Sequence, residues 1–349
     1  MTRKVKAMMT MNSSFDDADL LRASETLKAH DVWRIFTHRK SDGDAMGSAS
    51  ALFEAGVNLG KRVTWCSPDV KLPEGYKYLA HFGDFETVED FAFEDDGTLY
   101  VFLDCATEIR SVSGYDVSRG INSLNIDHHE DNSHYARVNC ADGRASSTCE
   151  MLYRMFMAGN WEITPRIAES LYTGLFTDTG GFTFSNTTPL AHDMAGRLIA
   201  LGGVKPDKMS DLISQNKNPA DFKVWAKAFS RVKVFGPGNI FAVTVLYRDD
   251  FVEAGADMTG TEGLSSMFMS IRGIKFIAVI TEYPDGNIRL SIRSREGSPF
   301  GAGEFARMFG GGGHERAAGC TLNVPISEAM NELERQIMKK YHECGCTNQ

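Results

Sequence analysis

The feature that most constrains this chain of 349 residues is where its acidic and imidazole side chains fall. They come directly after short apolar runs typical of buried β-strands, or at the end of a long helical pattern. These residues are His38, Asp42, Asp44, Asp104, Asp127, His128, His129 and Asp178. Because ligands bind beyond the carboxyl ends of the strands in an open parallel sheet, the pattern predicts one site built from four separate segments.

The first 200 residues alternate strand-like and helical patterns, which predicts an α/β domain. Residues 32–36 have the pattern of a short strand, while the continuous apolar run at 99–103 and a shorter one at 123–126 are typical of buried parallel strands. Residues 45–59 have a helical pattern that ends at Gly60, and Thr164-Pro165 has the composition of a helix start. We therefore expect an N-terminal doubly wound parallel sheet with right-handed crossovers.

The pattern changes after about residue 203, where prolines interrupt polar helical stretches up to residue 230. Beyond that point, strands are expected at 241–247, 274–281 and 288–293, and helices at about 304–309 and 327–341. Pro284-Asp285-Gly286-Asn287 is typical of a hairpin turn between the last two strands. These elements predict a second, smaller α/β domain with a mixed sheet.

The expected organisation therefore has three parts and an active-site cleft between the two domains. The parts are a metal-binding domain at 1–203, a helical linker at 204–230 and a substrate-binding domain at 231–343. The length agrees with this division, since domains usually span ~100–200 residues.

Clustered carboxylates indicate a bound cation. One Asp at a strand end is ordinarily a helix cap or a turn residue, but acidic and imidazole residues from four separate segments are harder to explain in that way. Carboxylates brought together repel each other and raise each other's pKa unless a cation compensates. Mixed Asp and His ligands suit ions such as Mn²⁺, Mg²⁺ or Zn²⁺, and their number is enough for two ions.

The composition of the chain restricts the kinds of binding partner and the cellular location that we expect. The formal net charge of −9 argues against a protein that coats long DNA, although it leaves room for a short phosphorylated substrate. Seven cysteines are too few for a disulfide framework, so a cytoplasmic location is the simplest expectation. The apolar run at 276–280 is far shorter than the ~20 residues that cross a bilayer, and residues 1–14 lack a signal-peptide core. We expect no membrane partner.

Five motifs resemble those of a known family. Four of them are Asp42-Gly43-Asp44, the single Asp104, Asp127-His128-His129 and Asp178-Thr179-Gly180, and they resemble the motifs of the DHH phosphoesterase superfamily. The fifth, Gly310-Gly311-Gly312-Gly313-His314 with Ala317-Ala318-Gly319, looks like the signature of the DHHA1 domain. The resemblance spans about residues 30–320 and is greatest to the stand-alone nanoRNase and pAp-phosphatase type.

The resemblance implies two divalent ions, Mn²⁺ in the first place, with Mg²⁺ or Co²⁺ as substitutes. It implies that His38, Asp42 and Asp104 hold one ion, and that Asp44, Asp104, His128 and Asp178 hold the other. A hydroxide between the ions would then be the nucleophile. Asp127 and His129 would lie behind the ligands, orienting them or facing the leaving oxygen, and complete the catalytic set with Asp104 and His128.

The second domain would bind the substrate's terminal phosphate or nucleotide. The resemblance implies that Arg293, Ser294, Gly312, Gly313 and His314 do this. An arginine can contact phosphate through two N–H groups, and a glycine run lets backbone N–H groups approach a ligand closely. Taken alone, Arg293 is more often a solvated strand-end residue, and the glycine run could equally be a hinge.

The implied activity is hydrolysis of short 5′-phosphorylated oligoribonucleotides to mononucleotides, and of adenosine 3′,5′-bisphosphate to AMP. Two alternatives stay open: a phosphodiesterase for cyclic dinucleotides or their linear products, and a non-catalytic nucleotide-binding protein of the same fold. A homodimer also stays open, because no sequence signal decides it.

Three further patterns have simpler explanations. Ser146-Ser147-Thr148 is expected to cap a helix rather than supply a nucleophile, because no His/Asp partner pattern accompanies it. Cys105 is expected to be a small buried residue. The tail His342-x-Cys344-x-Cys346 lacks a second pair of ligands and is expected to fray.

Overall fold

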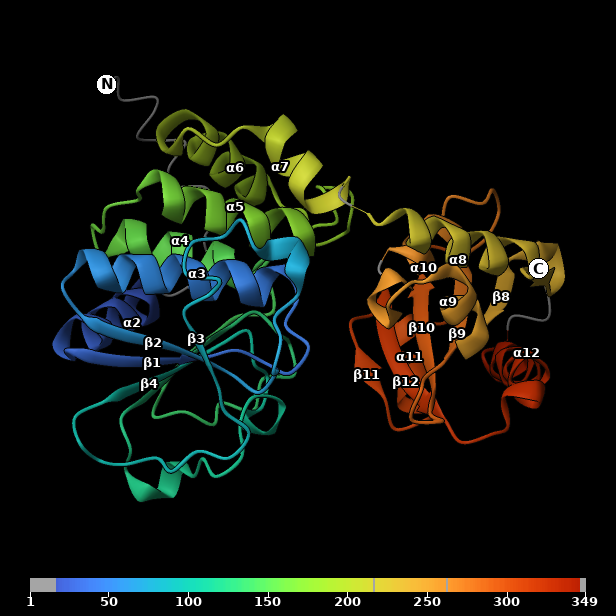
Figure 1. Cartoon of the computed structure of the whole chain (residues 1–349), viewed down its shortest axis with the longest axis horizontal. Helices are drawn as coiled ribbons and strands as arrows, with labels where there is room; N and C mark the ends of the chain where they lie inside the picture. The colour runs from blue at the N-terminus through green and yellow to red at the C-terminus, as the bar shows by residue number, and fades with distance from the viewer. Residues whose placement is uncertain (1–16, 216, 262, 346–349) are drawn as a thin grey trace. The chain divides into compact units, whose positions relative to one another are not determined.

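The computed structural model describes residues 17–215, 217–261 and 263–345. The chain divides into two compact units, residues 1–216 and 217–349, and each is described by itself (Figure 1). The boundary between the units, at 216/217, falls inside the stretch 204–230. That this stretch acts as a linker stays a prediction. Cys346 of the tail pattern lies outside the described residues.

The first unit is built on a sheet of six parallel strands in the order β3-β2-β1-β4-β5-β6. Their bounds are β1 (Val32–Phe36), β2 (Arg62–Ser67), β3 (Phe85–Thr87), β4 (Leu99–Leu103), β5 (Ser123–Asp127) and β6 (Val138–Ala141). Strands β2 and β3 are added on one side of β1, and β4, β5 and β6 are added on its other side. The strand order therefore reverses between β1 and β4, which is where an open α/β sheet binds its ligand.

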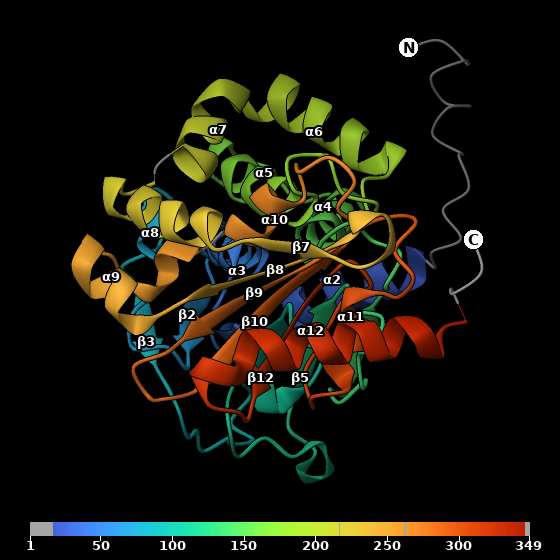
Figure 2. The same cartoon turned by 90° about the vertical axis from the view of Figure 1, so that its right-hand side faces the viewer.

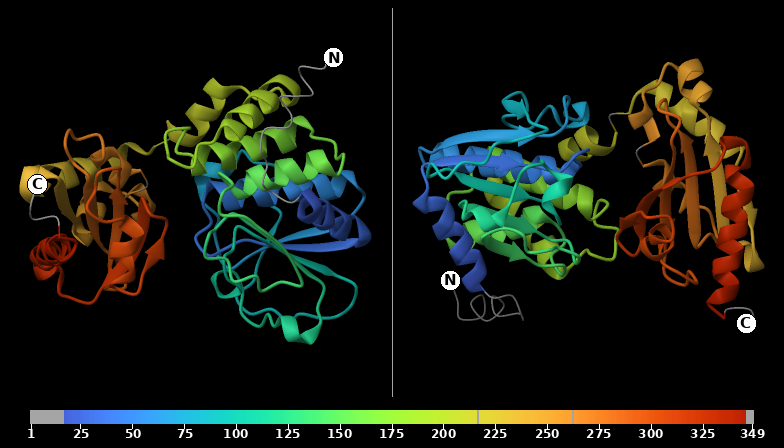
Figure 3. Two further views of the ribbon diagram at one scale, coloured as in Figure 1. Left: turned by 180° about the vertical axis from the view of Figure 1, so that it is seen from behind. Right: turned by 90° about the horizontal axis from the view of Figure 1, so that it is seen from below.

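Helices cover one face of this sheet (Figures 1 and 3). They are α2 (Asp17–Ala29), α3 (Gly43–Asn58), α4 (Thr148–Ala158), α5 (Pro165–Asp178), α6 (Pro189–Gly202) and α7 (Pro206–Ser214). Trp33, Ile35 and Val101 of the sheet belong to the same buried cluster as Leu52 and Leu171 of the helices. The predicted helix at 164–177 is confirmed, with Thr164 as its cap and Pro165 in its first turn.

The opposite face is covered by loops instead of helices. The connections from β3 to β4 and from β4 to β5 contain no α-helix among their described residues. Their aromatic side chains pack on the sheet, with Phe93 against Phe36 and Tyr100, and Tyr115 against Phe102. The first unit has short 3₁₀ turns at 74–76, 108–110 and 117–119, and the second unit has others at 237–239 and 258–261. Burial of rings thus replaces a helical layer on this side.

Three helices meet closely at Gly174 of α5. A Cβ atom placed on Gly174 would lie 2.3 Å from Sγ of Cys149 on α4 and 2.5 Å from Oδ1 of Asp44 on α3. Both distances are far below van der Waals contact, so only glycine fits there. The hydrogen atom of Gly174 lets α3 and α4 approach α5, which brings the acidic start of α3 close to the acidic end of α5.

The second unit contains a mixed six-stranded sheet in the order β11-β12-β10-β9-β8-β7. Its strands are β7 (Lys233–Phe235), β8 (Phe241–Leu246), β9 (Phe276–Glu282), β10 (Ile288–Ser294), β11 (Gly312–Gly313) and β12 (Ala317–Leu322). β8 and β9 are parallel and the other pairs are antiparallel. This confirms the predicted mixed α/β sheet.

Helices pack on both faces of the second sheet. They are α8 (Pro219–Ser230), α9 (Arg248–Ala254), α10 (Leu264–Phe268), α11 (Ala302–Arg307) and α12 (Ile326–Glu343). One face forms a buried cluster with α11 and α12, in which Leu333 and Phe305 join Phe276 (Figure 2). The other face packs on α8, α9 and α10. No helix among the described residues is long and apolar enough to span a membrane.

The sequence patterns do not indicate several short elements. β3, β6 and β7 are three or four residues long and only partly buried, so they lack a continuous apolar run. β12 consists of Ala317-Ala318-Gly319-Cys320-Thr321-Leu322, whose small residues give little strand signal. Neighbouring strands specify these elements more strongly than local propensity does.

Candidate metal centre

The first unit brings the eight acidic and imidazole residues to one edge of its sheet. His38 follows β1, Asp104 follows β4, and Asp127, His128 and His129 lie at the end of β5. Asp42 caps α3, its Oδ1 accepting hydrogen bonds from the backbone N–H groups of Asp44 and Ala45, and Asp178 is the last residue of α5. The edge includes the point between β1 and β4 where the strand order reverses.

Two buried histidines direct the same ring nitrogen toward the carboxylates. The Nδ1 of His38 is 2.9 Å from the carbonyl oxygen of Arg39, and the Nδ1 of His128 is 3.4 Å from that of Ala145. If each Nδ1 donates to its carbonyl, Nε2 is left as the lone-pair nitrogen facing the cluster. This is the arrangement in which metal-binding histidines are usually held.

Asp104 lies at the centre of the cluster. Its Oδ2 is 3.5 Å from Nε2 of His38, and its Oδ1 is 3.6 Å from Nε2 of His128 and 3.6 Å from Nδ1 of His129. Burial opposes ionisation of Asp104, but the three imidazoles outweigh it and lower the pKa of this carboxyl. Its backbone has a φ of +58°, a left-handed conformation that non-glycine residues rarely adopt and that often marks functional sites.

The carboxylates around Asp104 are held at an electrostatic cost. Burial and the charge of Asp104 raise the pKa of Asp44 well above its usual value. Burial and the charges of Asp42 and Asp104 do the same to the pKa of Asp178. A group of carboxylates that disfavour each other's charge is stabilised when a cation enters.

The same negative charge acts on the imidazoles with the opposite sign. Burial alone would lower the pKa of His38, but hydrogen bonding to Asp104 and Asp42 raises it to about 10. Burial likewise opposes protonation of His129, and Asp127 and Asp104 raise its pKa to about 9. Without a metal ion, the neighbouring carboxylates therefore favour protonation of these two imidazoles.

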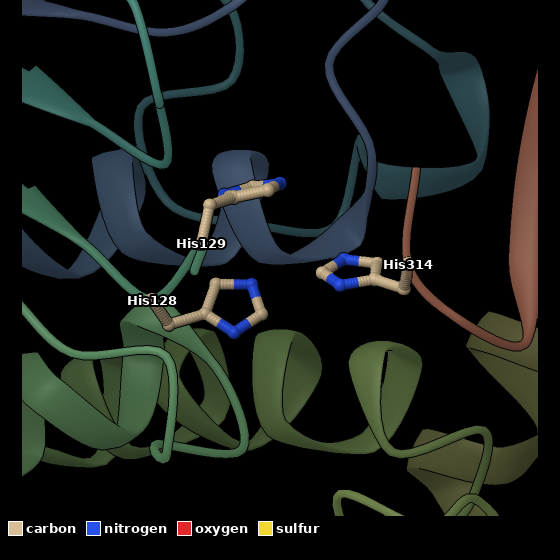
Figure 4. A group of neighbouring side chains, drawn as sticks. All are labelled: His128, His129 and His314. Atoms are coloured by element: carbon tan, nitrogen blue, oxygen red, sulfur yellow. The ribbon is translucent and has the colours of Figure 1, made fainter. Parts of the chain in front are cut away.

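His129 is oriented by a buried acid. Its Nδ1 is 2.7 Å from Oδ1 of Asp127, and Oδ2 of Asp127 accepts a hydrogen bond of 2.6 Å from the side-chain amide of Asn132. Asp127 is fully buried. Figure 4 shows the rings of His128 and His129 extending from neighbouring positions at the end of β5. Asp127 thus holds the ring of His129 beside Asp104, and the role expected for this pair stays a prediction.

Three sets of side chains in the first unit could hold a metal ion. In each set the nearest ligand atoms all lie within 4.8 Å of one another. The sets are His38, Asp42 and Asp104; Asp44, His128 and Asp178; and Asp104, Asp127 and His129. The first two contain the ligand groups expected from the sequence, and Asp104 adjoins both. Hard carboxylate oxygens mixed with imidazole nitrogens fit a divalent ion such as Mn²⁺ or Mg²⁺.

In the second unit, Arg293 and Ser294 occupy the end of β10. The Nε of Arg293 is buried and has no hydrogen-bond partner among the described residues, and burial lowers the pKa of this guanidinium. A buried donor without an acceptor is costly. The position of Nε therefore favours an anionic ligand at Arg293 over the alternative in which Arg293 is a solvated residue at a strand end. The hydroxyl of Ser294 donates to the carbonyl of Glu315 at 3.0 Å and accepts from the N–H of Ala302. This geometry favours a role for Ser294 in holding the segment beside His314.

The glycine run is partly a strand rather than only a loop. Gly312 and Gly313 form β11 and pair with Gly319 and Ala318 of β12. Gly313 has a φ of +132°, and a Cβ atom on it would lie 2.6 Å from the carbonyl oxygen of Ala317. His314 follows β11 and is exposed. The structure thus requires glycine at position 313, while the ligand-binding role of these residues stays a prediction.

Sequence reasoning missed several residues that hold the predicted ligands in place. The backbone N–H groups of Thr148 and Cys149 donate to the two carboxylate oxygens of Asp44, and the hydroxyl of Thr148 donates to Asp104. The amide of Asn186 donates to Asp178. Thr148 carried a signal only as part of the expected cap, where Ser147 is the N-cap of α4. Contacts between distant segments leave no local pattern in a sequence.

Two protein-family models match this chain, one after the other along the sequence. Residues 33–175 match the model of the DHH family, N-terminal domain, and residues 238–342 match that of the DHHA1 domain. The chain belongs to the DHH family, with the DHHA1 domain following the DHH domain.

Its similarity to individual proteins extends over both domains. It is 32% identical over 313 residues to the bifunctional oligoribonuclease and PAP phosphatase NrnA of Thermus thermophilus, covering 89% of this chain and 90% of that protein. It is 28% identical over 303 residues to the NrnA of Bacillus subtilis, covering 85% of this chain and 91% of that protein. The crystal structure of an exopolyphosphatase-related protein from Bacteroides fragilis matches the fold with a TM-score of 0.85 at 21% identity, covering 96% of this chain and 100% of that one.

Proposed function

We propose that this protein is a metal-dependent phosphoesterase that hydrolyses short 5′-phosphorylated oligoribonucleotides to mononucleotides and adenosine 3′,5′-bisphosphate to AMP. The observation that carries the proposal is the buried cluster in which Asp44, Asp104 and Asp178 lie around His38 and His128. Relatives that align over most of the chain have names stating these two activities, which supports the choice of substrates.

The proposed centre holds two divalent ions, and we favour Mn²⁺. His38 and Asp42 would bind one ion, Asp44, His128 and Asp178 the other, and Asp104 would serve both. When bound, such ions supply Lewis-acid stabilisation of phosphate charge and lower the pKa of a water molecule. Their positive charge also removes the repulsion that raises the pKa of Asp44 and Asp178.

The chain's own groups would position the reactants. The carbonyl oxygens of Arg39 and Ala145 orient the rings of His38 and His128, so that both present Nε2. The ring of His129 is held by Asp127, with Nδ1 2.7 Å from Oδ1 of that residue, and it lies beside Asp104. We assign to His129 the hydrogen bond or proton that the leaving oxygen needs when the phosphorus–oxygen bond breaks.

In the second unit, we assign recognition of the substrate's terminal phosphate or nucleotide to Arg293, Gly312, Gly313 and His314. The buried, unpaired Nε of Arg293 supports this assignment, because an anion would supply its missing acceptor. Ser294 would act by holding the segment at Glu315.

Substitution of Asp104 tests the proposal. Asp104→Ala and Asp104→Asn should each lower Mn²⁺-dependent hydrolysis of a 5′-phosphorylated dinucleotide by more than about 100-fold, since even residues behind metal ligands cost 10–100-fold. Asp104→Asn is the sharper variant, because Asn tolerates the left-handed backbone that Asp104 adopts. Asp193→Asn is the matched control, because Asp193 lies on the exposed surface of α6. Near-native activity of Asp104→Asn would refute the site.

A competition assay tests the substrates. We expect the highest kcat/KM for di- to pentanucleotides and adenosine 3′,5′-bisphosphate, compared with cyclic di-AMP. Faster turnover of cyclic di-AMP would instead support the alternative phosphodiesterase. Nucleotide binding without hydrolysis in the presence of Mn²⁺ would support a non-catalytic binding protein.

A further inference from the structure

The first turn of α4 contacts both halves of the candidate metal centre. Ser147 is the N-cap of this 11-residue helix, and its hydroxyl oxygen accepts the N–H of Glu150 at 3.0 Å. The N–H groups of Thr148 and Cys149, which have no acceptor within the helix, are directed at Asp44 instead. Thr148 is fully buried.

Asp44 receives one backbone hydrogen bond on each carboxylate oxygen. The N–H of Thr148 is 2.6 Å from Oδ2, and the N–H of Cys149 is 3.0 Å from Oδ1. The positive end of the helix dipole lies at the same place, which favours a negative charge there. Asp44 is therefore fixed in orientation by the backbone, and no substitution of the Thr148 side chain removes these bonds.

The side chain of Thr148 reaches the other carboxylate. Its hydroxyl donates to Oδ1 of Asp104 at 3.1 Å. The imidazole nitrogens near Asp104 are more distant, at 3.5–3.6 Å. The Thr148 hydroxyl is thus closer to Asp104 than these imidazole nitrogens are. With Oδ1 held by Thr148, Oδ2 is directed to His38.

We infer that Thr148 is a positioning residue that sets the orientation of the Asp104 carboxylate relative to Asp44, and so the spacing of the two ion sites. This inference rests on the proposed function, because it concerns the same centre. One residue binds Asp44 through its backbone and Asp104 through its hydroxyl, so the two carboxylates are held in place before any ion binds. Such preorganisation avoids part of the ordering cost of ligand binding.

Thr148→Val tests the inference, because valine keeps the branched shape and removes only the hydroxyl. Thr148→Ser is the matched control, because it keeps the hydroxyl and removes only the methyl group. The full chain is stripped of metal, and Mn²⁺ binding is measured by calorimetry in the absence of substrate. We expect Thr148→Val to weaken binding of at least one ion by about 10–100-fold and Thr148→Ser to bind within about threefold of the unmodified protein.

Kinetics give a second readout. At a fixed Mn²⁺ concentration that saturates the unmodified protein, Thr148→Val should lower kcat while the KM for a 5′-phosphorylated dinucleotide changes little. Thr148→Ser should restore kcat, which a merely structural role of the side chain would not require. If Thr148→Val does not fold, Thr148→Ala removes the hydroxyl with less bulk and enters the same comparison.

The outcomes separate this inference from the proposed function. Equal Mn²⁺ affinity of Thr148→Val and the unmodified protein overturns the inference alone, as does a Thr148→Ser variant that binds as weakly as Thr148→Val. Failure of the unmodified protein to bind any divalent ion overturns the proposed function and the inference together.

Discussion

Carboxylates in the two units have pKa values that shift in opposite directions. Asp44 and Asp178 in the first unit face other carboxylates, and burial with these neighbouring charges raises their pKa. Asp250 in the second unit faces Arg231, whose Nη2 donates to its Oδ1 at 2.8 Å, with a second contact between Nη1 and Oδ2. Burial opposes ionisation of Asp250 too, but Arg231 and the N–H of Tyr247 lower its pKa. Asp250 thus has a permanent cation as its partner, whereas Asp44 and Asp178 face other carboxylates and the imidazole of His128.

The contrast is sharpest when the same substitution is made in both units. Asp→Asn removes one negative charge and keeps the shape of the side chain. At Asp250 it removes half of an ion pair, whereas at Asp178 it removes a repulsion. We therefore expect opposite signs for the change in the free energy of unfolding.

Asp250→Asn should have the largest effect on stability. It leaves Arg231 without its partner and weakens the cap at Tyr247, so the second unit should lose about 2–3 kcal/mol at pH 7. Because the folded-state pKa of Asp250 is lowered, its contribution is present above the unfolded pKa of about 4 and is lost as the pH falls through the folded value. Hydrogen exchange should show faster opening of β8 and α9 at pH 7. Unchanged exchange there would contradict the pairing.

Gly313→Ala should have the next largest effect, in the exposed glycine strand of the second unit. The new Cβ would meet the backbone of Ala317 and require a left-handed region that alanine avoids, at a cost of about 1–3 kcal/mol. Gly312→Ala is the matched control for stability, because a Cβ at Gly312 has no atom within 4 Å. Urea unfolding measures both variants. Equal midpoints would mean that β11 does not need glycine at position 313.

Gly313→Ala also separates the two units functionally. Mn²⁺ affinity should stay unchanged, because the proposed ligands all belong to the first unit. The KM for the dinucleotide should rise, because Gly313 is assigned to substrate recognition. A loss of Mn²⁺ affinity would contradict the assignment of metal binding to the first unit and of substrate recognition to the second.

Asp178→Asn should have the smallest effect on stability, and it should be a gain. In metal-free protein at pH 8, removal of the repelled charge should stabilise the first unit by about 1 kcal/mol. The folded-state pKa of Asp178 is raised, so the penalty appears as the pH rises through that value and is absent below the unfolded pKa of about 4. Thermal unfolding at both pH values measures this change. Mn²⁺ should raise the melting temperature less in Asp178→Asn than in the unmodified protein, and an equal rise would remove Asp178 from the centre.

Local sequence patterns are sufficient to predict several elements of the fold and to place the candidate residues after strand ends. The short strand pattern at 32–36 and the continuous apolar run at 99–103 predict β1 and β4, and their positions place His38 and Asp104 after strand ends. The pairing of Thr148 with Asp44 joins residues 104 positions apart, so no local pattern encodes it. The short β6 is specified by its pairing with β5 rather than by its own composition. The role of the predicted ligand residues is a question for the variants above.

The close contact of the helices at Gly174 has a consequence for ion selectivity. The space that a methyl group would need at this glycine is already filled by Cys149 and Asp44, so α3 cannot move toward α5 and the carboxylates cannot rearrange freely. Ca²⁺ requires ligands at 2.3–2.6 Å and more of them, whereas Mg²⁺ takes ligands at 2.0–2.1 Å. The close packing of α3, α4 and α5 beside the proposed centre would oppose a rearrangement that suits the larger ion. Selection of Mg²⁺ over Ca²⁺ by ionic radius would then depend on the packing of helices around Gly174, a residue without a side chain.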